Sequence, residues 1–167
     1  MDRFTFPTGN EFIVTSTRPV VPEDYEFLYD LYKSMRAPEM GLVDWDENQK
    51  EQFLQMQFQA QQTHYQTTFP TADHQIILLD GRSIGRIYVN RTPDEIRLLD
   101  IILLPAYRNL GIGKTFLQQL QNEAANKNVP IRFYVWQFNL DAQRFYHRLG
   151  FQTVSEAGAY IQMEWNP

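Results

Sequence analysis

The chain has 167 residues, of which 43% are hydrophobic and 21% charged, values typical of one globular domain, which we expect over residues 1–167. Because cysteine is absent, a disulfide and a cysteine nucleophile are excluded, and three histidines without metal-ligand spacing predict no metal site. The net charge of −5 predicts that nucleic acid is not a partner. No apolar run has the length of a membrane span, which predicts no membrane partner, and no basic, apolar leader opens the sequence, so we expect a cytoplasmic protein.

The first part of the chain predicts one strand and two helices. Residues 11–18 are rich in β-branched side chains and predict a strand. A proline followed by two acids at 22–24 predicts a helix start, and apolar residues at helical spacing continue that helix to about Arg36. A capping-box pattern at Asp46 predicts a second, glutamine-rich helix that ends near Gln66.

Short apolar runs dominate the rest of the chain. Asp80-Gly81 is a hairpin signal between strands expected at 74–79 and 84–91. Residues 95–104 end in an unbroken apolar run, as a central strand buried on both faces would. The remaining expected elements are a helix from Gly111 to about Lys127, a strand at 131–135, a short helix between Asn139 and Gly150, and strands at 151–156 and 160–165.

This order of elements predicts an α+β fold in three layers. We expect a mixed, mostly antiparallel sheet of about seven strands with helices on both faces. The last strand, 160–165, is expected to be an exposed edge that could pair across a homodimer.

The most informative segment is residues 104–115, where two glycines stand between an apolar strand and a helix. A helix start leaves backbone N–H groups unpaired and glycine lets a ligand approach them, so this turn predicts a diphosphate site, with an ordinary turn as the alternative. Arg108 and Lys114 add positive charge there. A P-loop is disfavoured because Arg108 stands where its first glycine belongs, and a dinucleotide fingerprint because Phe116 replaces its third glycine.

Two blocks of sequence together resemble the GNAT superfamily of N-acetyltransferases. Arg108-x-x-Gly111-x-Gly113 after a strand resembles its acetyl-CoA signature. Downstream, Asn139, Ala142, Phe145-Tyr146 and Leu149-Gly150-Phe151 resemble its second block, so the resemblance covers about residues 74–165. It implies an acetyl-CoA-dependent enzyme that acetylates a small-molecule or peptide amine. The alternative is a non-catalytic acyl-CoA-binding sensor or interaction module on the same fold.

The resemblance also implies where acetyl-CoA binds. In this family the central strand splays from its neighbour after a bulge, and the gap admits the thioester. The strand backbone would pair with pantetheine, the amides of the glycine turn would bind pyrophosphate, and Asn139 would bond the pantetheine. The implied cofactor-binding residues are Ile101, Ile102, Leu103, Arg108, Asn109, Leu110, Gly111, Ile112, Gly113, Lys114, Asn139 and Tyr146.

Catalysis is expected to use Tyr146 and Asp100. Tyr146 lies at the edge of an apolar helix stripe, and a phenol with a pKa of about 10 can give its proton to a departing thiolate. Several relatives carry a glutamate base where this chain has Tyr134, so Asp100 is the expected substitute and Glu95 a more distant one. A backbone N–H of the central strand, from Leu103, would polarise the carbonyl group.

The acceptor amine is expected between the first two helices and the last two strands. Arg36, Tyr88 and Tyr160 are the expected contacts, with Met35, Glu39 and Trp45 as further candidates by location. The acids within residues 39–47 favour a cationic amine such as a polyamine, a lysine side chain or an amino sugar. Arg36 favours an acceptor with a carboxylate, such as an amino acid, and the sequence leaves both open.

Overall fold

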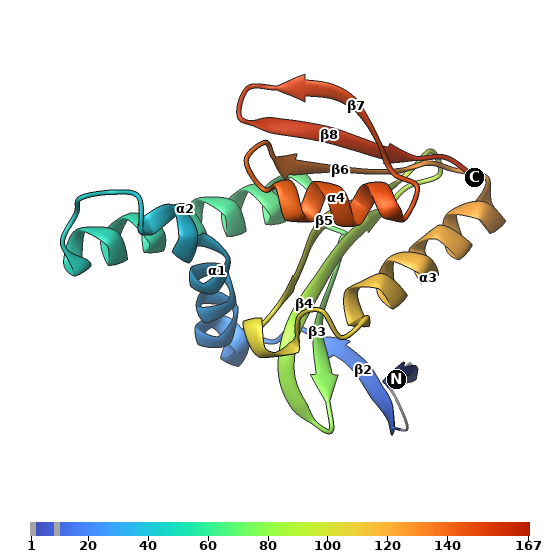
Figure 1. Ribbon diagram of the computed structural model, residues 1–167, viewed down its shortest axis with the longest axis horizontal. Helices are drawn as coiled ribbons and strands as arrows, with labels where there is room; N and C mark the ends of the chain where they lie inside the picture. The colour runs from blue at the N-terminus through green and yellow to red at the C-terminus, as the bar shows by residue number, and fades with distance from the viewer. Residues whose placement is uncertain (1–2, 9–10) are drawn as a thin grey trace.

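The computed structural model describes residues 3–8 and 11–167, and within them the chain forms one eight-stranded sheet and four α-helices (Figure 1). The strands are β1 (Arg3–Thr8), β2 (Glu11–Pro19), β3 (Asp73–Leu79), β4 (Arg82–Arg91), β5 (Ile96–Leu103), β6 (Ile131–Trp136), β7 (Gln152–Ala157) and β8 (Tyr160–Trp165). The helices are α1 (Tyr25–Met40), α2 (Glu47–Thr68), α3 (Ile112–Lys127) and α4 (Leu140–Arg148), with short 3₁₀ turns η1 (Pro22–Asp24) and η2 (Pro105–Tyr107).

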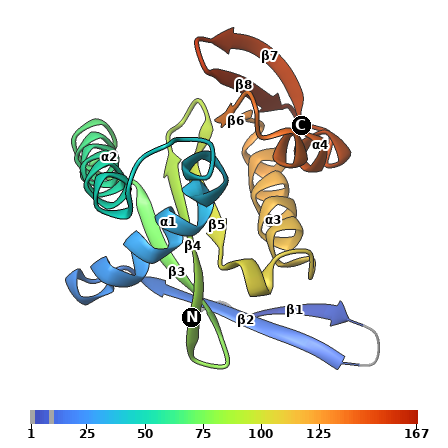
Figure 2. The ribbon, with the colours of Figure 1, turned by 60° about the vertical axis from the view of Figure 1, so that its left-hand side comes forward.

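The sheet has the strand order β1-β2-β3-β4-β5-β6-β8-β7. Neighbouring strands run antiparallel except β5 and β6, which are parallel. The expected mixed, mostly antiparallel sheet is therefore confirmed. The sheet gains one strand over the expected seven, because β1 pairs with β2 as the outer strand of a hairpin, seen below α1 and α3 in Figure 2.

Helices cover both faces of the sheet, as expected (Figure 2). On one face α1 and α2 bury Leu31 and Phe58 completely, together with Ile76 of β3. On the other face α3 buries Leu117 with Ile77 of β3, and apolar residues of α4 pack against the same core. Since successive strand residues point to opposite faces, β3 contributes to both cores.

The helix boundaries follow the local signals, with one difference. The capping box of α2 is confirmed, because the Gln49 N–H donates to Asp46 Oδ1 at 2.8 Å and the Asp46 N–H donates to Gln49 Oε1 at 3.0 Å. α1 continues four residues past the expected end at Arg36, and Pro38 lies inside its last turn. Proline at this place removes only one backbone donor near the helix end, so the helix can continue.

The last strand is not an edge, and the expectation for residues 160–165 was wrong. β8 lies between β6 and β7 and pairs with both, because the final hairpin folds back and inserts β8 beside β6. The edge strand is instead β7, every residue of which is exposed. In the described part of the chain, no helix combines the length and apolarity that crossing a membrane requires.

Candidate active site

The strands β5 and β6 separate after a short paired stretch (Figure 1). They pair only at Ile96 with Ile131 and at Arg97 with Arg132, while the Ile96 N–H donates to the Pro130 carbonyl at 2.9 Å. Beyond these residues β5 runs along β4 alone, and β6 runs along β8. The divergence of β5 and β6 is called the splay below, and it leaves one edge of β5 without a partner strand.

A β-bulge lies on β5 where the splay begins. Tyr88 of β4 pairs with Asp100 whereas Val89 pairs with Leu98, so Leu99 is the extra residue. The Tyr65 hydroxyl of α2 donates to the Leu99 carbonyl at 3.0 Å, which gives this carbonyl a partner. The bulge therefore lies two residues beyond Arg97, the last residue of β5 that pairs with β6.

The unpaired edge of β5 presents the backbone of Ile101 and Leu103. The Leu104 N–H donates to the Ile84 carbonyl at 2.8 Å, and backbone groups of a strand alternate in direction, so Ile102 faces β4 while Ile101 and Leu103 face the splay. The Leu103 carbonyl accepts a hydrogen bond from Arg108 Nε at 3.0 Å. Of the three expected strand residues, two therefore face the splay.

The turn before α3 is built to leave amides free. Asn109 and Gly111 have positive φ angles of 61° and 85°, and glycine adopts such a φ without strain. The Thr115 N–H bonds to the Gly111 carbonyl at 3.2 Å, whereas the N–H groups of residues 109–114 have no acceptor among the described residues. These six amides, named the amide mouth here, point away from a 16-residue helix whose dipole adds positive charge.

The amide mouth is open to a ligand with anionic oxygens. Nothing lies within 4 Å of a Cβ built on Gly111, so a ligand can approach the backbone there. The Lys114 side chain is exposed at the same helix start, and the exposed Arg108 links the mouth to the edge of β5 through Leu103. Free amides, an open approach and two cations are the groups that bind phosphate oxygens.

Tyr146 is half-buried on α4, on the face of the sheet that α3 covers. Its ring packs against Phe133 of β6 at 4.4 Å between centroids, and against Phe145 and Phe151. Burial, and to a lesser extent the negative charge of Asp100, raises the pKa of the Tyr146 phenol well above its ordinary value. The hydroxyl therefore stays protonated at neutral pH and can act as an acid. Asn139 caps α4, since its Oδ1 accepts from the Ala142 N–H at 3.2 Å.

Asp100 forms an ion pair that spacing along the chain did not predict. Arg86 of β4 donates from Nε and Nη2 to Asp100 Oδ2, and its guanidinium also bonds Gln61 and Gln62 of α2. Sequence reasoning missed Arg86, Tyr65 and the two glutamines. The available signal was an arginine in the middle of a buried strand, because such a cation needs a carboxylate on a neighbouring strand.

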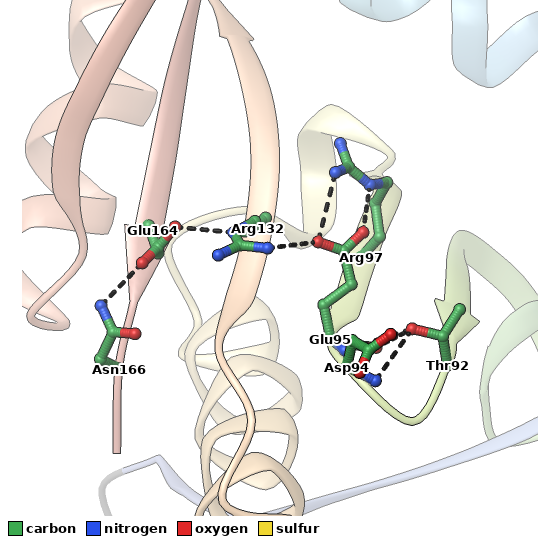
Figure 3. A network of polar contacts seen from close by, with 7 residues as sticks. All are labelled: Thr92, Asp94, Glu95, Arg97, Arg132, Glu164 and Asn166. Atoms are coloured by element: carbon green, nitrogen blue, oxygen red, sulfur yellow. Dashed lines mark hydrogen bonds and ion pairs between the residues drawn. The ribbon is translucent and has the colours of Figure 1, made fainter.

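Glu95 lies at the closed end of the splay, within a network of ion pairs (Figure 3). It accepts from Arg97 Nε at 2.7 Å and from Arg132 Nη1 at 2.9 Å, and Arg132 also donates to Glu164 of β8. Burial opposes the charge of Glu95, but the two arginines outweigh it, and its pKa is lowered. Glu95 thus joins β5 to β6 and β8.

Most of the residues expected to contact the acceptor are bonded to or packed against other residues of the protein, and one is exposed. Arg36 donates to Glu39 at 2.8 Å and to the Tyr32 hydroxyl, so its charge is already neutralised. Tyr88 is only 5% exposed and stacks on His74, which keeps its ring away from the surface. Tyr160, at the start of β8, is 52% exposed. Met35 is a partly buried residue of α1, and the Trp45 ring packs on that of Phe53 with 5.2 Å between centroids.

Residues 26–151 match the profile of a family described as Acetyltransferase (GNAT) family. The chain belongs to the GNAT acetyltransferase family. The resemblance in the sequence is thereby confirmed, and so is the expected enzyme class, since this family consists of acetyl-CoA-dependent N-acetyltransferases.

Solved structures share the fold of this GNAT chain. PaiA N-acetyltransferase from Thermoplasma acidophilum, in complex with coenzyme A, is 22% identical with a TM-score of 0.69 over 92% of this chain and 99% of its own. Ard1 from Thermoplasma volcanium is 18% identical with a TM-score of 0.60 over 91% and 97%. Arabidopsis thaliana Naa50, in complex with the bisubstrate analogue CoA-Ac-MVNAL, is 15% identical with a TM-score of 0.61 over 92% and 99%. Comparison with curated protein sequences gives no significant match.

Proposed function

We propose that the chain transfers an acetyl group from acetyl-CoA to a primary amine by direct attack within a ternary complex. The observation that carries this proposal is the adjacency of the amide mouth and the unpaired edge of β5, because together they suit the two ends of one cofactor. The diphosphate would lie on the amides of residues 109–114. The pantetheine would pair with Ile101 and Leu103, and with Asn139 across the splay.

When bound, acetyl-CoA supplies an activated acetyl thioester, and the chain supplies position and proton transfer. Holding the amine against the thioester is worth up to about 7–11 kcal/mol of the barrier. The Leu103 N–H faces the splay and would polarise the acetyl carbonyl. Tyr146 would give its proton to the leaving sulfur, since its raised pKa keeps the phenol protonated until a thiolate forms beside it.

Asp100 would take the proton that the amine loses. A nitrogen becomes far less basic as it turns into an amide, so an ordinary carboxylate can accept its proton at that stage. Asp100 follows the bulge and its side chain is 14% exposed, and its negative charge adds to the rise in the pKa of Tyr146. These observations support the choice of Tyr146 as acid and Asp100 as base at the splay.

The acceptor proposed is a primary amine that approaches from the side of α1, α2 and the start of β8. The acidic loop offers less free charge than the sequence predicts, because Glu39 binds Arg36 and Asp46 caps α2. Arg36 is likewise neutralised by Glu39, so these residues favour neither a polycationic acceptor nor an acceptor with a free carboxylate. The exposed Tyr160 suits an amine on an apolar or peptide body. The peptide-like analogue bound by Naa50 is consistent with this class.

Thiol release from acetyl-CoA, measured against a panel of polyamines, amino acids, amino sugars and N-terminal peptides, tests this function. Turnover with at least one amine class is expected. Gly113→Asp would place a carboxylate in the amide mouth and should abolish coenzyme A binding in calorimetry, whereas Gly158→Asp in the β7–β8 turn serves as a control. Binding without turnover on every amine would favour the acyl-CoA sensor instead. Unchanged binding by Gly113→Asp would overturn the diphosphate site.

A further inference from the structure

One arginine lies buried in the centre of the sheet, on β4 beneath α2. The Arg86 side chain is 0% exposed, and an unpaired guanidinium there would cost several kcal/mol. Its Nε donates to Asp100 Oδ2 at 3.1 Å, and Nη2 donates to the same oxygen. Nη2 also donates to Gln61 at 3.0 Å, and Nη1 to Gln62 at 3.3 Å. A single cation therefore joins β4, β5 and α2.

The place of this ion pair indicates a role beyond stability. Buried ion pairs are often no more stabilising than apolar side chains of the same size. Here the pair adjoins the bulge, where Tyr65 already bonds the Leu99 carbonyl. Gln61, Gln62 and Tyr65 lie within about one turn of α2. The helix α2 therefore holds the bulge at two points. Tyr65 bonds the Leu99 carbonyl, and the two glutamines bond Arg86, which in turn bonds Asp100.

The two carboxylate oxygens of Asp100 have different surroundings. Oδ2 receives both hydrogen bonds from Arg86, whereas no hydrogen bond to Oδ1 is found within residues 3–8 and 11–167. The charge of Asp100 adds to burial in raising the pKa of Tyr65 on α2 and of Tyr146 on α4. The carboxylate therefore lies near phenols from both sides of the sheet.

One histidine and three tyrosines around this pair are uncharged, and Asp24 is a further charged group that acts on the histidine. Burial, and then the positive charge of Arg86, lowers the pKa of His74 to about 4, so this imidazole is neutral at pH 7. It stacks on Tyr88 with 4.0 Å between ring centroids. Tyr65, Tyr88 and Tyr146 all have raised pKa values, chiefly through burial. Arg86 is thus the cation that faces Asp100 from the neighbouring strand.

We propose that Arg86 is a positioning residue for acetyl transfer, because by holding Oδ2 of Asp100 it presents Oδ1 to the acceptor amine. This role rests on the proposed function. The C–N bond forms as the C–S bond breaks, one proton moves from nitrogen to Oδ1, and another moves from Tyr146 to sulfur. The thioester and the amine then give an amide and a thiol, and both side chains exchange protons with water to return to their starting states.

The experiment is a double-mutant cycle with steady-state kinetics on an accepted amine. Arg86→Lys keeps the charge but loses the forked donors, so kcat should fall on the order of 10–100-fold while coenzyme A affinity changes less than about 2-fold. Asp100→Asn should lower kcat further than Arg86→Lys does. Adding Arg86→Lys to Asp100→Asn should lower kcat by less than about 3-fold more, because Arg86 acts only through that carboxylate.

Arg86→Met gives a second readout, the split between kcat and KM. Without the forked donors Oδ2 is no longer held, so kcat should fall at least as far as in Arg86→Lys while KM for acetyl-CoA changes less than about 2-fold. Arg91→Lys is the matched control, since Arg91 lies on the same strand but binds Glu123 at its far end, and its kcat should not change. If Arg86→Met does not fold, the cycle with Arg86→Lys still decides the question.

Each outcome separates the positioning role from the proposed function. The role of Arg86 would be overturned if the falls in kcat of the two single variants multiplied in the double variant. A fall in melting temperature and coenzyme A affinity with an unchanged kcat would overturn it as well. Full turnover by Asp100→Asn would instead remove Asp100 as the proton acceptor, and with it the step that the proposed function assigns to this residue.

Discussion

Tyr146 keeps its proton because its phenol is packed among aromatic rings. Burial raises its pKa, and the negative charge of Asp100 raises it further. Tyr146→Phe removes the hydroxyl but keeps the ring contact with Phe133. We expect kcat to fall by about 10²- to 10⁴-fold, the usual contribution of a general acid. The affinity for coenzyme A, measured by calorimetry, should stay nearly unchanged.

Tyr134→Phe is the control for this measurement. Tyr134 is 51% exposed on β6, at the position where the resemblance in the sequence implies a general base. A neutral phenol is a poor base, so its loss should leave kcat within about 3-fold of the native value. Equal rates for Tyr146→Phe and Tyr134→Phe would show that the leaving thiolate receives its proton from elsewhere.

Gly85 marks the close approach of β4 to β5 beside the splay. A Cβ there would clash with the Ile102 carbonyl oxygen and lie 2.8 Å from Leu103 Cδ2. Gly85→Ala must push β5 away, so the free energy of unfolding should fall by about 1–3 kcal/mol in urea denaturation. Coenzyme A binding should weaken as well, because Leu103 moves. Gly41→Ala meets its nearest atom at 3.5 Å and should not destabilise in this way.

At the scale of elements, β5 and β6 are held together at one end and free at the other. The polar network of Figure 3 closes the joined end, where Arg132 of β6 donates to Glu95 at 2.9 Å and to Glu164 of β8 at 2.7 Å. The two parallel pairs of Ile96 and Arg97 lie at the same end. A fixed joint at this end allows the far ends of the strands to stay apart without loss of the sheet.

Glu95→Gln tests this joint through the pH dependence of stability. The folded pKa of Glu95 is lowered: burial raises it, but Arg97 and Arg132 outweigh that rise. Its charge therefore stabilises the fold above the unfolded pKa of about 4.3 and loses this effect as pH falls through the folded value. At pH 7 the variant should lose about 1–2 kcal/mol of unfolding free energy.

As pH falls through the lowered folded pKa of Glu95, the difference between native protein and variant should disappear, since the native carboxylate is then protonated too. Glu156→Gln on the exposed edge strand β7 is the comparison and should change stability little at either pH. A difference between native protein and Glu95→Gln that stayed constant from pH 3 to pH 7 would contradict an electrostatic joint.

At the scale of the whole molecule, the sequence predicted what depends on local spacing. The four helices, seven strands, the capping box of α2 and the two-glycine turn all follow from residues close together in the chain. β1 was missed because Pro7 ends a short alternation over residues 3–6, and the segment forms a strand only against β2. The insertion of β8 between β6 and β7 depends on pairing between distant segments, which spacing does not report.

In the candidate site, too, the sequence predicts the residues of contiguous motifs but not those that distant segments bring together. The amide mouth and Tyr146 belong to contiguous motifs, and the sequence was enough to propose them. The pair of Arg86 and Asp100 requires the register of β4 against β5, and that register includes a bulge that shifts one residue. Tyr65 comes from a helix 34 residues earlier than the carbonyl that it bonds. Such contacts become visible only once the sheet and α2 are assembled.

The arrangement of the whole molecule also supports the proposed order of the reaction. The amide mouth belongs to α3, the proposed acceptor side to α1, α2 and β8, and the two meet at the splay. Direct transfer therefore needs both reactants bound together. The chain has no cysteine to carry the acetyl group, and the raised pKa of Tyr146 keeps its phenol protonated and poorly nucleophilic. Double-reciprocal plots at several amine concentrations should give intersecting lines, with coenzyme A competing against acetyl-CoA. Parallel lines, or an acetylated protein detected by mass spectrometry after mixing with acetyl-CoA alone, would contradict direct attack.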